Sequence, residues 1–76
     1  MNSLTNKQIR ELMSEFSPSP GYILNLSRIE FEELVEDETG IDISEDYDSN
    51  GKRLKALLKS CSDVQANSLI AALRAL

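Results

Sequence analysis

The sequence contains no histidine and no tryptophan, and it has a single cysteine, Cys61. One cysteine cannot form an internal disulfide, and a metal site built from cysteine and histidine is excluded. The Cys61 thiol also has no histidine that could act as its base, which argues against nucleophilic catalysis. We therefore expect Cys61 to be a small core residue, and we expect neither an enzyme nor a cofactor.

Long hydrophobic runs are missing as well. Residues 1–7 lack the apolar run of a signal peptide, and no stretch is long enough to span a bilayer. These features predict a cytoplasmic chain that does not bind membranes.

Aromatic residues make up only 5% of the chain, so leucine and isoleucine must supply most of the core. A length of 76 residues predicts one domain, 1–76. A hydrophobic content of 41% with 28% charged residues is typical of a globular domain.

The net charge is −5, which disfavours generic binding to a phosphate backbone. The distribution of charge is uneven. Ten of the thirteen acidic residues lie between Glu30 and Asp48, and four basic residues follow directly at Lys52, Arg53, Lys55 and Lys59. The molecule should therefore have an acidic side and a basic side.

Three capping boxes predict the starts of three helices, because in each one a side chain can satisfy the other residue's free backbone N–H. The pairs are Thr5 with Gln8, Ser27 with Glu30, and Ser62 with Gln65. Apolar residues at helical spacing follow each box and also mark a fourth helix. They are Ile9, Leu12, Met13 and Phe16; Phe31, Leu34 and Val35; Leu54, Leu57, Leu58 and Cys61; and Ala66, Leu69, Ile70 and Leu73.

The predicted fold class is all-α, a compact bundle of four main helices plus one or two short helical turns. The helices cover about 6–16, the segment between Ser27 and Gly40, about 51–60, and 62–76. Proline at positions 18 and 20 ends the first helix, and Gly40 ends the second. The last helix has no stop signal, from which we expect the chain to be the N-terminal module of a longer protein.

Two segments between the helices should be ordered. The residues 22–24 are too apolar for a solvated loop, so we expect them to pack as a short turn. The alternating residues 41–51 could form a strand, but no partner strand is predicted, and a lone strand would leave its backbone unpaired. We interpret this segment as an ordered connector.

The sequence Asp46-Tyr47-Asp48-Ser49-Asn50-Gly51 matches the first half of an EF-hand loop. Calcium in such a loop needs a glutamate at the twelfth position, which here is Leu57. We favour a polar turn in which Asp48 or Ser49 caps the third helix and Gly51 gives backbone freedom. The Asp48-Ser49 pair also occurs in acyl carrier proteins, but the helix that follows here is basic, and we reject that interpretation.

Candidate interface residues come from the two charged runs. The basic face comprises Lys52, Arg53, Lys55 and Lys59, and the acidic face comprises Glu32, Glu33, Glu36 and Asp37. The basic run could instead enter a nucleic-acid groove, or it could be a solvated face that pairs in part with the acidic helix. Because the net charge is acidic, we place a protein interface first.

The order of these motifs resembles a family of bacterial modules. The relevant stretches are Phe31-Glu-Glu-Leu34-Val35, Thr39-Gly40-Ile41-Asp42-Ile43, Tyr47, Gly51-Lys52-Arg53-Leu54 and Ser68-Leu69-Ile70-Ala71-Ala72-Leu73. Together with Ile9, Leu12 and Phe16 they are similar to the small helical N-terminal modules of bacterial anti-phage conflict proteins. These are the effector-associated, death-like adaptor domains and the N-terminal regions of abortive-infection proteins. Death-like domains usually have six helices, whereas four are predicted here. The resemblance implies an adaptor that couples a sensor or effector through contacts between like domains.

Three functions are compatible with these observations. The first is a protein–protein interaction domain of a bacterial defence or signalling protein, whose partners include a second copy of the same domain. The second is a free-standing acidic inhibitor of the phage-encoded type, and the third is a nucleic-acid-binding domain that uses the basic helix. A basic helix interrupts the acidic surface that an inhibitor would need.

Overall fold

Four helices account for most of the computed structural model, which describes residues 2–18 and 21–76. They are α1 (Asn6–Phe16), α2 (Arg28–Thr39), α3 (Asn50–Ser60) and α4 (Asp63–Arg74). No strand occurs in the described ranges, which confirms the all-α class. The short turns are also present, each as a single hydrogen-bonded turn: Leu26 N–H donates to Ile23 and Asp46 N–H donates to Ile43.

The predicted capping boxes are all formed. In α1, α2 and α4 the cap side chain accepts from the backbone of the third helical residue, and that residue's side chain accepts from the cap backbone. Helix α3 is capped instead by Ser49, whose hydroxyl accepts from Lys52 N–H. Gly40 ends α2 in the left-handed conformation, with φ of 74°. Ser19 and Pro20, which the sequence assigns to the break after the first helix, lie outside the described residues.

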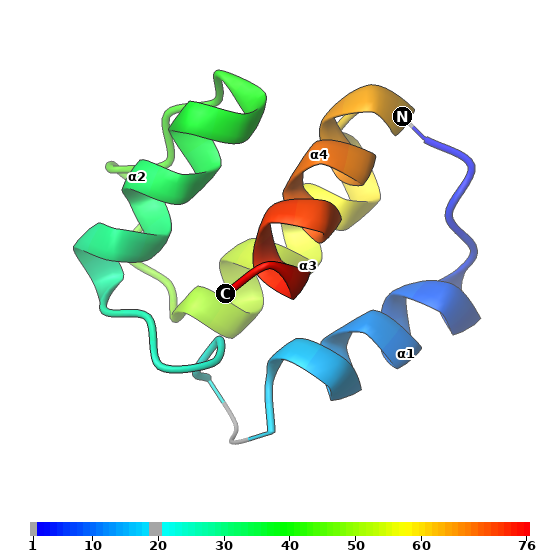
Figure 1. Ribbon diagram of the computed structural model, residues 1–76, viewed down its shortest axis with the longest axis horizontal. Coiled ribbons are helices and arrows are strands. Elements are labelled where there is room, and N and C mark those ends of the chain that lie inside the picture. The colour runs from blue at the N-terminus through cyan, green and yellow to red at the C-terminus, as the bar shows by residue number, and fades with distance from the viewer. Residues whose placement is uncertain (1, 19–20) are drawn as a thin grey trace.

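Helix α1 packs against α3, and α2 packs against α4. Figure 1 shows α1 and α2 at opposite edges of the molecule, with α3 and α4 between them. The buried faces of the helices meet in one core of leucine, isoleucine, valine and phenylalanine. Met13, Leu34 and Ile70 lie at its margin, half-buried.

The connector between α1 and α2 only partly follows the prediction. Ile23 is fully buried, but Tyr22 is 65% exposed and does not pack inside the molecule. Leu24 N–H donates to Phe16 O, which draws the connector back onto the end of α1. Leu24 has φ of 50°, a left-handed backbone that is unusual for a residue with a bulky side chain.

A close approach between two glycines fixes the start of α3. Gly51 N–H donates to Gly21 O over 3.2 Å, and a Cβ on Gly51 would lie 3.3 Å from Gly21 Cα. The sequence predicts that Gly51 supplies backbone freedom. The structure shows that it supplies space, because Gly51 lies in the first turn of a regular helix against another segment's backbone.

The N-terminal residues bind the C-terminal end of α3. The Asn2 side-chain amide donates to Leu58 O and Cys61 O over 2.8 and 2.9 Å, so it satisfies two carbonyls that the helix end leaves free. Ser3 donates from its N–H and its hydroxyl to Asp63 Oδ1. These contacts join the chain's first residues to the α3–α4 corner.

Candidate interaction surface

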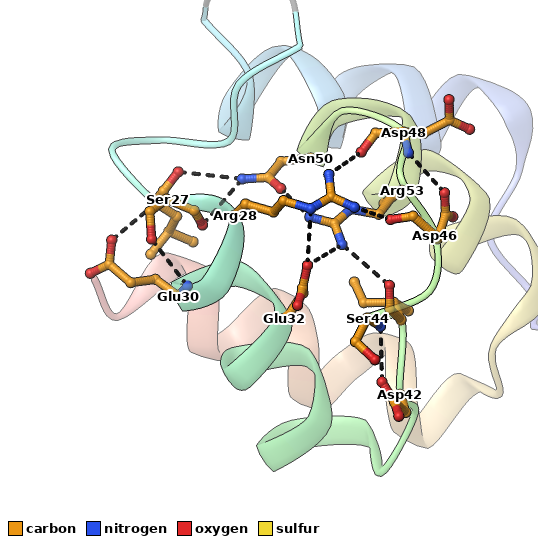
Figure 2. Close-up of polar contacts among 12 residues, drawn as sticks. Ser27, Arg28, Glu30, Glu32, Asp42, Ser44, Asp46, Asp48, Asn50 and Arg53 are labelled. Atoms are coloured by element: carbon orange, nitrogen blue, oxygen red, sulfur yellow. Dashed lines mark hydrogen bonds and ion pairs between the residues drawn. The ribbon is translucent and has the colours of Figure 1, made fainter.

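Arg53 is buried between α2 and α3. It is 1% exposed, although the sequence predicts it on an exposed basic face. Its guanidinium donates to Glu32 Oε2 over 2.9 Å, to Asn50 Oδ1 over 2.6 Å and to Ile43 O over 3.3 Å (Figure 2). The prediction for Arg53 is therefore wrong, because this side chain is buried, bonds within the chain and cannot contact a partner.

Asn50 holds the guanidinium in place from the first residue of α3. Its amide nitrogen donates to Leu26 O and Ser27 O, and its oxygen accepts from Arg53. The Arg53 guanidinium also lies 5.6 Å from the centre of the Phe31 ring, within range of a cation–π contact. Arg53 Nε has no hydrogen-bond partner in the described part of the chain.

Glu32 belongs to the same internal network. Its Oε2 lies 2.9 Å from Arg53 and 3.3 Å from Arg28 Nε, and its side chain is only 19% exposed. Glu32 is therefore largely committed to contacts within the chain, unlike the other predicted residues of the acidic face. The expected pairing between the basic run and the acidic helix is thus limited, within residues 2–18 and 21–76, to one residue of each.

Arg28 ties the connector after α2 to the start of that helix. Its guanidinium donates to Asp46 O and, over 3.1 Å, to Asp48 O (Figure 2). It also lies 5.6 Å from the centre of the Tyr47 ring. Tyr47 is nevertheless 83% exposed. The predicted ordered connector is thus held by two arginines, Arg28 from outside and Arg53 from inside.

The EF-hand-like residues form a polar turn, as predicted. Asp46 Oδ1 accepts from Asp48 N–H, Ser49 caps α3, and Asn50 is occupied by contacts inside the chain. No group of three or more metal-binding side chains is found in the part of the chain that the structure describes.

Cys61 is buried at the end of α3, as predicted. Burial raises the pKa of its thiol, with the Asn2 amide as a smaller opposing influence. A thiol in this state is a poor nucleophile.

Lys52, Lys55 and Lys59 are exposed along α3. Lys55 and Lys59 face Arg10 of α1 across a groove of about 180 Å³ whose other lining residues are Asn6 and Ile9. None of these four cations has an ion-pair partner among the described residues. The three lysines remain candidates for the basic face, and Arg10 joins them.

Sequence reasoning missed Arg10 and its neighbour Lys7, which is exposed one turn earlier on α1. Their spacing of three residues on the polar side of a predicted helix was the available signal, since residues three apart are neighbours on a helix surface. That α1 lies beside α3 depends on tertiary packing, which local patterns do not contain.

Glu33, Glu36 and Asp37 are exposed on α2 and have neither ion pairs nor side-chain hydrogen bonds in the described ranges. They lie three and four residues apart and so share one strip of the helix. The unpaired anions lie on α2, at one edge of the bundle, and the unpaired cations lie on α1, at the opposite edge, and on α3 between them (Figure 1).

Comparison of the chain with protein-family models, with curated proteins and with solved structures finds no match. None of the helices in the described ranges is long and apolar enough to cross a membrane.

Proposed function

We propose that this chain is a non-enzymatic protein–protein interaction domain, an adaptor that binds a charged surface of its partner. A second copy of the domain is among the partners that we propose. The observation that carries the proposal is the separation of unpaired charge. Lys52, Lys55, Lys59 and Arg10 lie on α1 and α3, whereas Glu33, Glu36 and Asp37 lie on α2.

Separated charge of this kind favours recognition over stability. Exposed ion pairs add little to folding, but complementary patches steer partners together and select among them. Three arginines, Arg28, Arg53 and Arg74, have ion pairs within the chain, and of these Arg53 is buried. The free cations are left for contacts with other molecules.

The setting we propose is the cytoplasm of a bacterium, in a defence or signalling protein, following the resemblance to the N-terminal modules of anti-phage conflict proteins. The four helices and two turns are compatible with a small adaptor.

Binding to nucleic acid is the second candidate, favoured by the same unpaired cations. Lys52, Lys55 and Lys59 would neutralise phosphates, and binding would weaken steeply as salt is added. A net charge of −5 opposes it. A mobility shift of duplex or single-stranded nucleic acid at low salt would favour this candidate over the adaptor.

Light scattering behind size exclusion tests the proposal, at low and high protein concentration and in low and high salt. We expect assembly that grows with concentration and that salt dissolves, because salt screens exposed charges. A strict monomer under all four conditions contradicts the homotypic form of the proposal.

A further inference from the structure

The cations of α1 and α3 surround a groove with an apolar floor. The groove is lined by Asn6, Ile9, Arg10, Lys55 and Lys59, and Ile9 is only 3% exposed. An adjoining hollow of about 440 Å³ is lined by Lys52 and Lys55 with Met13, Gly21 and Gly51 among its other residues. Lys55 belongs to both, so the two hollows form one basic surface, which we call the basic groove.

The acidic side chains of α2 have the opposite charge. Glu33, Glu36 and Asp37 form a strip on one exposed helix face, which we call the acidic strip. A straight helix rises about 1.5 Å per residue, so the strip is about 6 Å long and the row from Lys52 to Lys59 is about 10 Å long. The row of lysines is therefore long enough to pair with the whole strip.

One molecule cannot close this contact on itself. Helix α1 lies at one edge of the bundle and α2 at the other, with α3 and α4 between them (Figure 1). The basic groove lies between α1 and α3 and includes no residue of α2, so each copy presents the groove and the acidic strip as two separate surfaces. A contact between two different surfaces of identical chains is heterologous, and it leaves one groove and one strip free at the ends of every assembly.

We propose that the basic groove of one copy receives the acidic strip of a second copy, so that the domain assembles head to tail. This inference rests on the proposed function and specifies its partner and geometry. Charge complementarity selects the occupant, since the chain itself carries both halves. Arg53 and Glu32 take no part, because they already pair with each other inside each copy.

Two charge-reversed variants test the geometry. Lys55→Glu/Lys59→Glu, the groove variant, keeps its acidic strip, and Glu33→Lys/Glu36→Lys, the strip variant, keeps its basic groove. All four positions are exposed and unpaired in the described ranges, so both variants should fold, which circular dichroism checks. Light scattering then measures the mass of each variant alone, of their mixture and of wild type.

The expected result has three parts. Each variant alone is monomeric at concentrations where wild type assembles. The equimolar mixture assembles, because the intact strip of the groove variant enters the intact groove of the strip variant, and the reversed groove and the reversed strip are complementary to each other as well. A small fraction of either variant shortens the assemblies of wild type, because it caps one end.

The contrary results separate the two proposals. If wild type assembles but either variant assembles equally well, or the mixture stays monomeric, the head-to-tail geometry is wrong and self-association stands. If wild type stays monomeric at every concentration and salt, the inference fails together with the homotypic form of the proposed function.

Discussion

Arg53 Nη1 donates to Glu32 Oε2 over 2.9 Å, and this hydrogen bond joins α3 to α2 through a side chain with no exposed surface. A buried guanidinium is costly unless all its charge is compensated. Here Glu32, Asn50 and the Ile43 carbonyl share that task. The pair therefore stabilises the contact between α2 and α3, and the neighbouring lysines have no part in it.

Removing Glu32 should destabilise the domain more than removing any exposed glutamate of the same helix. Glu32→Ala leaves Arg53 buried with its charge unpaired, and we expect a loss of about 2–3 kcal/mol in the free energy of unfolding. Urea denaturation followed by circular dichroism measures it. Glu33→Ala, which removes the same charge from an exposed position, is the matched control and should change stability by less than about 0.5 kcal/mol. Equal effects of the two substitutions would contradict the structural role of the pair.

Gly40 is required for its backbone conformation and not for space. Its φ is 74°, and a Cβ added there would meet nothing within 4 Å. We expect Gly40→Ala to cost about 1 kcal/mol, and Gly40→Asn to cost less, because asparagine tolerates the left-handed region better than alanine. Thermal unfolding of the two variants beside wild type checks the order. A Gly40→Ala variant as stable as wild type would show that the left-handed end is not needed.

The stability of the domain should fall in acid through carboxylates that accept hydrogen bonds from residues distant in the sequence. Ser3 N–H and hydroxyl lower the pKa of Asp63 from its ordinary 3.8, and Arg74 lowers the pKa of Glu15. A carboxylate with a lowered folded-state pKa stabilises the protein above its unfolded-state pKa, and that stabilisation is lost as pH falls through the folded-state value.

Asp63→Asn should therefore weaken the dependence of stability on pH below about pH 4. Urea midpoints measured between pH 6 and pH 2 test this, with Glu33→Gln as the control for removing one negative charge. A pH profile of Asp63→Asn that parallels wild type would show that the Ser3–Asp63 contact contributes nothing to folding.

Cys61 should react with thiol reagents only when the domain opens. The side chain is 4% exposed, and burial raises the pKa of its thiol, so little thiolate is available in the folded state. We expect reaction with a disulfide reagent to be slow in buffer and to accelerate as urea unfolds the chain. Asn2→Ala removes two hydrogen bonds to the end of α3 and should raise the rate in buffer by letting that end open more often, an effect that outweighs the loss of the amide that lowers the thiol pKa. Rapid labelling of the folded wild type would contradict the burial of Cys61.

The helices could be predicted from the sequence because their signals are local. Each capping box lies within four residues, and each apolar stripe repeats within one helix. Gly40 as the end of α2 and Ser49 as the cap of α3 follow from the same short-range chemistry. The exposure of Tyr22 was missed because it depends on how the connector crosses the ends of α1 and α3.

The burial of Arg53 could be predicted only in part from the sequence. Successive helix residues are turned by about 100°, which sets Lys52, Lys55 and Lys59 together and turns Arg53 towards Leu57. That rotation was a signal in the sequence. The partners that make burial possible, Glu32 and the Ile43 carbonyl, come from other elements, and their positions depend on how α2 packs beside α3. Arg10 enters the basic groove for the same reason.

The most direct test of the account compares two variants of equal net charge by light scattering at high protein concentration and low salt. Lys55→Gln/Lys59→Gln removes two positive charges from the basic groove, and Asn25→Glu/Val64→Glu adds two negative charges at exposed positions outside it. The account predicts that the first variant is monomeric while the second assembles as wild type does. Equal behaviour of the two variants, whether both assemble or both do not, would contradict the basic groove as the site of contact.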